Sequence, residues 1–319
     1  MSHTTLITGG TGFAGSHLVE LLLKETAEEI HVTSFSDRKS FVHTLLPETQ
    51  IHLVDLTNRK KVFELIEELK PSKIYHLAAI SEVGKSFEAA SEIINNNTIL
   101  QLNVLEAVRE IVPQARVLIV GSAQEYDLIK GLGDRVQGQI DENHPLGPAN
   151  PYGVSKVSQD LLGLSYFYAY GLDIVRVRPF NHVGERQTPE FAISDFAQAI
   201  VKIERAEQDE LQVGNLEAIR DFSDVKDIVA GYKLLLEKGE AGEVYNLGSG
   251  MGQSVNQVLE LMKSLAIVEI PLKVAQNRLR PVDVKMIVAD NSKILSLGWQ
   301  PQFQLKHTLE RVLNYWRQQ

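Results

Sequence analysis

The feature that most constrains the fold is a glycine loop near the amino terminus. The apolar run "TTLITGG" (4–10) is typical of a buried strand, and "SHLVELLLKETAEE" (16–29) has helical periodicity. Between them, Gly9 allows a tight turn, Gly12 lets the backbone approach a diphosphate, and Gly15 permits close packing of helix on strand. This order predicts a dinucleotide-binding βα unit. Cofactor contacts are predicted for Gly9, Thr11, Gly12, Phe13 and Ala14.

Strand-like runs continue to alternate with helical segments through the first half of the chain. Such alternation predicts an α/β protein with a Rossmann-type, doubly wound parallel sheet and helices on both faces. The further strand-like runs are "IHVTSF", "IHLVDL", "KIYHLAA", "RVLIVGS", "LDIVRVRPF" and, near the end, "EVYNLGS". Further helices are predicted over 59–69, 86–110, 152–170, 190–207, 253–265, 290–297 and 304–317.

Beyond residue 181 the alternation loosens, which predicts two domains. We expect a cofactor domain over 1–181 and a smaller, mainly substrate-binding domain over 182–319, with strand segments near 213–250 returning to the first. The net charge of −9 argues against a nucleic-acid partner, and no apolar run approaches membrane-spanning length. The chain has no cysteine, so no thiolate metal site is available. We expect a cytoplasmic protein without a metal.

The residues after the second strand favour a cofactor that carries a 2′-phosphate. An NAD enzyme places Asp or Glu at this strand tip to bind the ribose hydroxyls, but the tip here is the neutral Ser34. Arg38 in the following loop suits a 2′-phosphate, whereas Asp37 beside it would suit NAD. NADP is therefore predicted, with NAD left open. Asp55 and Leu56, after the third strand, either flank the adenine or only end the strand and cap the next helix.

A proton-transfer group is predicted from Ser122, Tyr152 and Lys156. Tyr152 and Lys156 are four residues apart and share one face of a helix. A lysine charge near a phenol lowers its pKa, and such a tyrosine exchanges a proton with a carbonyl or alcohol oxygen. Ser122 ends the strand "RVLIVGS" and is expected to hydrogen-bond the same oxygen. A lone Tyr-x-x-x-Lys motif also arises by chance. A glycine loop, then a strand-end serine, then Tyr-x-x-x-Lys in this order is a far more specific signal for such a proton-transfer group. The lysine is also expected to hold the nicotinamide ribose.

Several other segments complete a pattern that covers nearly all of the chain. They are "HLAA" (76–79), "RPFN" (178–181), "RDFSDVKDI" (220–228), "EVYNLGSG" (243–250) and "LGWQP" (297–301). With these motifs the chain resembles the extended short-chain dehydrogenase/reductases that modify nucleotide sugars. The resemblance implies a Rossmann domain with a small carboxyl-terminal substrate domain, and Ala78 and Ala79 along the cofactor groove. It also implies a homodimer that pairs the helices of 86–110 and 152–170.

The segment after Ser122 separates two enzyme classes within this resemblance. In the sugar-nucleotide 4,6-dehydratases of the family, an acid stands two residues after the strand-end Thr or Ser, because loss of water needs a base for the C5 proton. Here that position is Gln124, whose amide is neither an acid nor a base. Glu125 is adjacent, but one step along an extended segment turns the side chain to the other face. The sequence favours a protein that does not dehydrate, unless a register shift brings Glu125 into use.

The run "VGNLEAIRDF" (213–222) is similar to that of the GDP-mannose 4,6-dehydratases and their relatives, the GDP-4-dehydro-6-deoxy-D-mannose reductases. The resemblance implies a GDP-sugar substrate. Arg220 and Arg280 are candidate clamps for its diphosphate, although each is also a candidate for an ordinary ion pair. The predicted substrate contacts are Gln124, Asn181, Arg186, Asn215, Arg220 and Arg280.

Together, these motifs predict a reductase of the C4 ketone of GDP-4-dehydro-6-deoxy-D-mannose that gives GDP-D-rhamnose, with hydride from NAD(P)H and Tyr152 as proton donor. A GDP-mannose 4,6-dehydratase, which is a lyase, is the first alternative. An NAD-dependent nucleotide-sugar 4-epimerase is the second, because it uses the same Ser, Tyr and Lys. A non-catalytic nucleotide sensor is disfavoured because all three residues are present.

Overall fold

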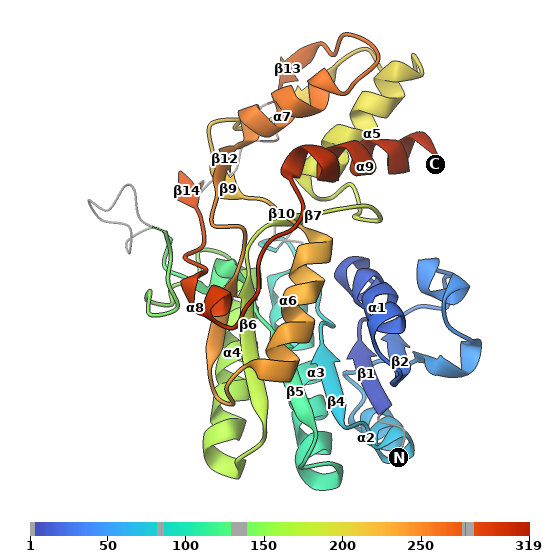
Figure 1. Ribbon diagram of the computed structural model, residues 1–319, viewed down its shortest axis with the longest axis vertical. Helices are drawn as coiled ribbons and strands as arrows, with labels where there is room; N and C mark the ends of the chain where they lie inside the picture. The colour runs from blue at the N-terminus through green and yellow to red at the C-terminus, as the bar shows by residue number, and fades with distance from the viewer. Residues whose placement is uncertain (1–3, 82–83, 85, 129–138, 276–277, 279–283) are drawn as a thin grey trace.

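A central sheet of seven parallel strands organises the molecule (Figure 1). The computed structural model describes residues 4–81, 84, 86–128, 139–275, 278 and 284–319. The strand order across the sheet is β11-β6-β5-β4-β1-β2-β3. The strands are β1 (Thr4–Thr8), β2 (Glu29–Ser34), β3 (Ile51–Leu53), β4 (Lys73–His76), β5 (Arg116–Val120), β6 (Ile174–Pro179) and β11 (Val244–Leu247). All seven strands predicted from the sequence are confirmed, and so is the α/β Rossmann-type fold class.

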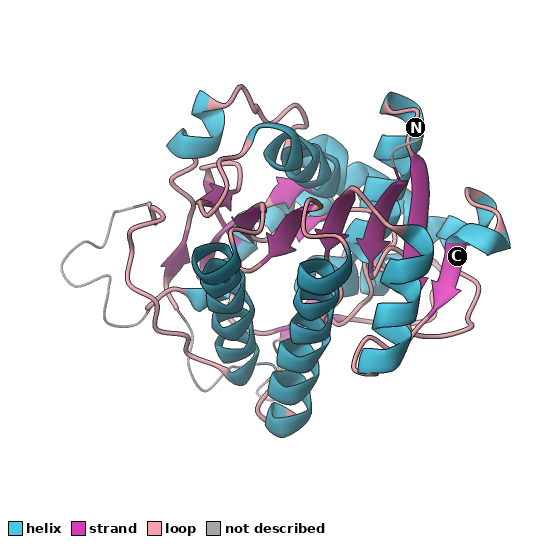
Figure 2. Cartoon of the chain, turned by 90° about the horizontal axis from the view of Figure 1, so that it is seen from below, coloured by secondary structure: helices cyan, strands magenta, loops and turns pink. Residues whose placement is uncertain are grey.

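Helices cover both faces of the sheet (Figure 2). On one face α1 (Phe13–Glu25) packs against α6 (Val225–Lys238), and on the other α2 (Arg59–Leu69), α3 (Ala90–Ile111) and α4 (Pro151–Tyr170) lie side by side. Successive residues of a strand point to opposite faces of the sheet. Leu6 packs on the face covered by α2, α3 and α4, and Ile7 packs on the face covered by α1 and α6. Strands buried on both sides explain why the strand segments are apolar throughout rather than alternating.

Helix α6 is an element that the sequence analysis did not predict. Its apolar residues recur at helical spacing, with Val225, Ile228, Val229 and Tyr232 all buried. The Asp224 side chain accepts a hydrogen bond from the backbone N–H of Lys226 and so caps the helix. This segment was interpreted only as part of a motif, although its period and its cap were visible in the sequence.

A smaller lobe of helices and short strands stands at one end of the sheet (Figure 1). Its helices α5 (Ala192–Glu204), α7 (Val255–Ser264) and α9 (Leu305–Arg317) share a core separate from the two that flank the sheet. Its short strands are β7 (His182–Val183), β8 (Leu211–Val213), β9 (Ile219–Asp221), β10 (Ser223–Asp224), β12 (Gly252–Ser254), β13 (Leu272–Val274) and β14 (Met286–Ile287). The other short helices of the described chain are not part of this core; they are α8 (Ser292–Ser296), η1 (Phe41–Thr44), η2 (Glu48–Gln50) and η3 (Ala123–Glu125).

The carboxyl-terminal segment ties this lobe to the sheet domain. The indole N–H of Trp299 donates to the backbone oxygen of Asp227 on α6 at 3.0 Å. The Asp227 carboxylate accepts the backbone N–H groups of Gln302 and Phe303 at 2.8 and 3.1 Å. Within the described part of the chain, no helix combines the length and apolar character needed to cross a bilayer.

The strand order places a crevice at the centre of the sheet. From β1 the chain runs outward through β2 and β3, and then crosses over to β4 on the opposite side of β1. In open parallel sheets, ligands bind at such a reversal, beyond the carboxyl ends of the strands. The loops after β1, β2, β4, β5 and β6 therefore define where the candidate site lies.

Candidate active site

The glycine loop lies at this crevice, close to the end of β4. Gly9 has a φ of +68°, and a Cβ there would lie 3.0 Å from the Cα of Ala78. Gly12 precedes α1 without any side-chain hydrogen bond to the first turn, and that turn holds no acidic residue. The first N–H groups of α1 are therefore open to an anion, as a helix amino terminus that binds a diphosphate requires. Thr11, Phe13 and Ala14 are partly exposed beside it.

Two of the predicted cofactor residues touch each other at the end of β2. The Thr11 hydroxyl donates to Ser34 Oγ at 3.1 Å, and Ser34 Oγ donates to the backbone oxygen of Ser36 at 2.8 Å. Arg38 follows in an exposed loop. The tip of β2 thus offers hydroxyl groups, with a cation near it in sequence. Asp37, which would suit NAD, is exposed in the same loop.

The ends of β3 and β4 carry the other predicted cofactor residues. Asp55 Oδ1 accepts the backbone N–H and the hydroxyl of Thr57 at 2.9 and 2.7 Å, while Leu56 is buried in the core. These contacts fit the interpretation that Asp55 and Leu56 end the strand and cap the next helix. A contact between these two residues and adenine stays a prediction. The backbone N–H of Ala78 donates to Thr8 Oγ1 at 3.2 Å, and Ala79 follows, partly exposed.

The structure brings Ser122, Tyr152 and Lys156 together. Ser122 caps η3 after β5, and it hydrogen-bonds the phenol of Tyr152 in the first turn of α4. Asn150 caps α4 by accepting the N–H of Gly153 at 2.8 Å, which fixes the helix start just before the tyrosine. Lys156 lies one turn further on, with Nζ 6.0 Å from the centre of the Tyr152 ring. This geometry suits proton exchange with an oxygen placed beside the phenol and the serine.

The expectation that Lys156 lowers the pKa of Tyr152 is wrong for this structure. Burial raises the pKa of Tyr152 to about 12, with the hydrogen bond from Ser122 opposing the rise and Glu125 adding to it. Burial lowers the pKa of Lys156 to about 8, with Glu125 opposing the fall. The Lys156 ammonium donates instead to the backbone oxygen of Val120 at 2.8 Å and to Gln159 Oε1 at 2.9 Å.

The two residues after Ala123 have opposite environments. Gln124 is partly exposed, and its Oε1 accepts from the amide of Asn150 at 3.1 Å. Glu125 is fully buried: its Oε1 accepts the backbone N–H of Ser122 at 2.7 Å, and its Oε2 accepts Nε of Arg178 at 2.9 Å. The neutral amide therefore faces the open side of the segment, and the carboxylate faces the protein interior.

The predicted substrate residues are scattered around the lobe. Asn181 is exposed after β6, and Asn215 is exposed in a turn where its Oδ1 accepts the N–H of Glu217 at 2.9 Å. Arg220 donates to the backbone oxygens of Ile219 and Val284, both at 2.8 Å, and so links β9 to the segment just before β14. Arg280 lies outside the described residues.

Arg186 lies against helix α1 of the sheet domain. Its Nε donates to Ser16 Oγ at 3.0 Å, and its Nη2 donates to Glu20 at 3.1 Å. Its guanidinium also stacks over the ring of Phe41 at 4.0 Å. These contacts join the lobe to α1, and substrate binding by Arg186 stays a prediction.

His182 is a neighbour of the glycine loop that the sequence did not assign to the site. Its ring stacks on Phe13 with a centroid distance of 5.8 Å and an interplanar angle of 9°. Its Nδ1 contacts the backbone oxygen of Phe180 at 2.9 Å, and burial lowers its pKa. A neutral imidazole therefore lines the groove beside Phe13.

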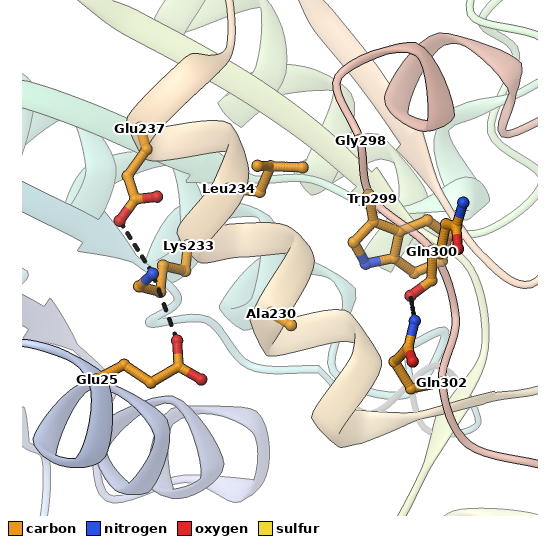
Figure 3. A pocket seen from close by; sticks show the side chains of 9 residues that line it. All are labelled: Glu25, Ala230, Lys233, Leu234, Glu237, Gly298, Trp299, Gln300 and Gln302. Carbon is orange, nitrogen blue, oxygen red and sulfur yellow. Dashed lines mark hydrogen bonds and ion pairs between the residues drawn. The ribbon is translucent and has the colours of Figure 1, made fainter.

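A surface hollow of about 290 Å³ lies elsewhere, between α1, the outer side of α6 and the segment after α8 (Figure 3). Its lysine, Lys233, pairs with Glu25 at 3.4 Å and with Glu237 at 3.1 Å. None of the predicted site residues lines it. The lining residues are Glu25, Ala230, Lys233, Leu234, Glu237, Gly298, Trp299, Gln300 and Gln302.

The parallel sheet with its crossover, the open glycine loop and the Ser–Tyr–Lys group define an enzyme with the Rossmann-like fold of the short-chain dehydrogenase/reductases. The chain belongs to the GDP-mannose 4,6 dehydratase family, which it matches over residues 6–312. It is therefore an oxidoreductase-type member of a family of nucleotide-sugar enzymes.

Individual relatives cover the whole chain. The GDP-6-deoxy-D-mannose reductase of Pseudomonas aeruginosa is 29% identical over 321 residues, which are 99% of this chain and 98% of the relative. The structure of RMD from Pseudomonas aeruginosa complexed with NADPH has a TM-score of 0.85 and 27% identity, and 99% of each chain is covered. The UDP-glucose 4-epimerase of Thermus thermophilus in complex with NAD has a TM-score of 0.86 and 25% identity, with 98% of this chain and 99% of that one covered.

Proposed function

We propose that the protein reduces the C4 ketone of GDP-4-dehydro-6-deoxy-D-mannose to give GDP-D-rhamnose. Tyr152 gives a proton to the ketone oxygen, and Ser122 orients that oxygen by a hydrogen bond. Lys156 contributes a positive charge beside them. When bound, a reduced nicotinamide supplies the hydride. The similarity to the Pseudomonas reductase over the full chain supports this choice among the activities of the family.

The observation that carries the proposal is the environment of residues 124 and 125. Elimination of water from a hexose needs a base at C5 and an acid for the departing hydroxyl. Gln124 carries an uncharged amide at this point of the site, and the Glu125 carboxylate is buried and bound to Arg178. Neither side chain offers an ionisable oxygen to a bound sugar. Ketone reduction needs only the proton donor that Tyr152 supplies.

For the cofactor we propose NADP, held along the ends of β1, β2 and β4. The amino terminus of α1 is free of side-chain caps, so its N–H groups suit the diphosphate. The hydroxyls of Thr11 and Ser34 replace the acid that an NAD-specific site uses, and Arg38 is exposed nearby for a 2′-phosphate. The NADPH bound to the Pseudomonas structure supports the same choice, whereas the NAD of the epimerase structure keeps NAD as the alternative.

Substitution of Gly15 by alanine is expected to weaken binding of NADPH by a factor of about 5 to 150. A Cβ at this position would lie 2.4 Å from the backbone oxygen of Gly9 and 2.7 Å from the Cα of Gly10. The loop would have to shift, and overpacking of this kind costs about 1–3 kcal/mol, while about 1.4 kcal/mol corresponds to a tenfold change in Kd. Fluorescence titration measures the change. Gly84→Ala is the control because a Cβ there meets nothing within 4 Å. Equal affinities of the two variants for NADPH would contradict the proposed binding of the cofactor at the glycine loop.

The proposed activity is tested by product analysis with purified protein. Incubation of GDP-4-dehydro-6-deoxy-D-mannose with NADPH should give a product with two more hydrogens, and NADH should support a slower reaction. NMR of the product then assigns the configuration at C4. GDP-mannose without reduced cofactor should stay unchanged, and its conversion to the 4-keto-6-deoxy sugar would establish the dehydratase instead. Turnover of UDP-glucose without net use of cofactor would point to the epimerase.

We further propose that the protein acts as a homodimer through α3 and α4. These two helices pack against each other on one face of the sheet, and each exposes apolar side chains. Ile99 on α3 and Val154 and Leu161 on α4 are 41%, 40% and 45% exposed. A second copy of this pair would cover them. Light scattering after size-exclusion chromatography should give twice the 35.6 kDa chain mass.

A further inference from the structure

Arg186, in the lobe, has a backbone conformation that favours glycine. Its φ is +71°, in the left-handed region, where a residue with a Cβ is sterically disfavoured. A residue stays in such a conformation only where the contacts around it hold it there. The Arg186 side chain is therefore expected to make contacts that offset this strain.

The guanidinium of Arg186 reaches from the lobe to two elements of the sheet domain. On α1, its Nε donates to Ser16 Oγ at 3.0 Å and its Nη2 donates to Glu20 at 3.1 Å. On η1, the guanidinium carbon lies 4.0 Å from the centre of the Phe41 ring. The Arg186 side chain is only 17% exposed, so these contacts are largely shielded from solvent. One side chain of the lobe thus joins α1 to η1.

Both of these elements border the groove proposed for the cofactor. Ser16 lies one turn into α1, and its hydroxyl donates to the backbone oxygen of Phe13, at the end of the glycine loop, at 2.8 Å. Phe41 begins η1, which closes the loop that follows β2. In a dinucleotide site the helix start receives the diphosphate, and the loop after the second strand receives the adenosine ribose. Arg186 therefore contacts two borders of the part of the groove that would hold the adenosine end.

The loop between β2 and η1 carries Arg38, the predicted contact for a 2′-phosphate. At the start of the loop, the Ser34 hydroxyl donates to a backbone oxygen of the loop itself at 2.8 Å. At its end, Val42 is buried in the core, whereas Phe41 is 37% exposed even with Arg186 over its ring. A loop that is already held in its binding conformation loses little freedom when the ligand arrives, and affinity is higher for that reason.

We propose that Arg186 is a positioning residue for the dinucleotide: by joining α1 to η1, it holds the loop of Arg38 in the conformation that receives the adenosine end of the cofactor. This inference deepens the proposed function, on whose cofactor groove it rests. It assigns Arg186 to cofactor binding, whereas the sequence pattern predicted a substrate contact for the same residue. The two assignments differ in the ligand whose affinity a substitution changes.

The first test is Arg186→Met, which removes the charge and the donors and keeps a long apolar side chain. We expect the Kd for NADPH to rise by a factor of about 2 to 30, the range that corresponds to the loss of a cation–π contact. The Kd for GDP, a probe of the substrate site, should stay at the wild-type value. Isothermal titration calorimetry measures both constants. With the keto sugar, the KM for NADPH should rise while kcat stays close to wild type. If the wild type binds NADH more tightly than NADPH, the same titrations are made with NADH.

The contact with η1 is tested by Phe41→Leu and by the double variant. Leucine keeps an apolar side chain and removes the ring on which the guanidinium stacks. Phe41→Leu should also weaken NADPH binding, and the double variant should bind NADPH about as weakly as Arg186→Met alone, because the effects of residues in contact are not additive. Two effects that multiply in the double variant would show that the residues act independently, and would overturn the proposal.

Stability and cofactor affinity should separate at Arg186, which a merely structural role would not allow. Glycine adopts a positive φ without steric cost, so Arg186→Gly should unfold at a higher urea concentration than Arg186→Met and yet bind NADPH as weakly. Arg311→Met is the matched control. Arg311 donates to Glu185 at 3.0 Å and to Asp224, the cap of α6, so it joins the lobe to a different helix of the sheet domain. This variant should lose stability with the Kd for NADPH unchanged.

An unchanged Kd for NADPH in Arg186→Met and in Phe41→Leu would overturn the proposal. A weaker Kd for GDP in Arg186→Met, with NADPH binding intact, would establish the substrate contact instead. Equal losses of NADPH affinity in Arg186→Met and Arg311→Met would show that any loosening of the lobe has this effect, and would also overturn it. If these variants behave as expected but the wild type does not reduce the ketone, only the proposed function is removed.

Discussion

Replacement of Tyr152 by phenylalanine is expected to lower kcat for ketone reduction by a factor of about 10²–10⁴, the range for loss of a positioned general acid. The phenol is buried beside Ser122, so solvent does not replace the lost proton donor. The aromatic ring itself is retained, so the Kd for NADPH should change little. Stopped-flow measurement of NADPH oxidation gives kcat, and fluorescence titration gives the Kd.

Tyr168→Phe is the control for that substitution. Tyr168 lies on the same helix, α4, but is 75% exposed on the surface. Removal of its hydroxyl should leave kcat at the wild-type value. A Tyr152→Phe enzyme that reduces the ketone as fast as the Tyr168→Phe enzyme would show that another group donates the proton.

Replacement of Arg178 by methionine is expected to reduce the free energy of unfolding by about 3–5 kcal/mol, as for other buried ion pairs that lose one partner. Glu125 loses the guanidinium that binds it, while Asp160 keeps its ion pair with Arg176. Urea unfolding followed by circular dichroism measures the loss. Arg59→Met is the control: Arg59 and its partner Glu110 are exposed, so about 1 kcal/mol or less is expected.

The loss of unfolding free energy caused by Arg178→Met should become smaller as the pH falls. Burial already raises the pKa of Glu125, and removal of Arg178, which opposes the rise, raises it further. A carboxyl with a folded-state pKa above its unfolded value destabilises the protein at high pH, and that penalty disappears below the unfolded value, near 4.5. Measurements at pH 8 and pH 5 should therefore give a smaller difference from wild type at pH 5. A deficit that does not depend on pH would indicate lost packing rather than unpaired charge.

The sheet was predictable because each strand is a short apolar run bounded by glycine or polar residues. The α2 bounds of 59–69 match the predicted ones, whereas α3 begins at Ala90 rather than at residue 86. Helix α6 was missed although its period was regular, because the segment was assigned to a motif. The three-residue and two-residue strands of the lobe, such as β13 and β14, depend on pairing with distant partners and carry no periodic signal of their own.

The site was predictable where spacing along one element decides contact, as for Tyr152 and Lys156 on α4. Gln124 and Glu125 do have different surroundings, but the reason expected from the sequence was wrong, because residues 123–125 form the short helix η3 rather than an extended segment. The link from Glu125 to Arg178 was not predictable, because it joins residues on different elements that only the folded sheet brings together. The direction of the Tyr152 pKa shift was missed because burial, which spacing does not reveal, is the largest effect on the phenol.

The position of β11 has a consequence for the order in which the nascent protein can fold. Strand β6 is interior in the finished sheet, since β11 pairs with it from Val244↔Arg176 to Leu247↔Pro179. On the ribosome, β6 emerges long before β11, and translation at about 5–20 residues per second leaves its outer edge unpaired for seconds. An exposed strand edge invites pairing with other chains. The interval between these two strands is therefore a period of synthesis in which a chaperone would protect this protein.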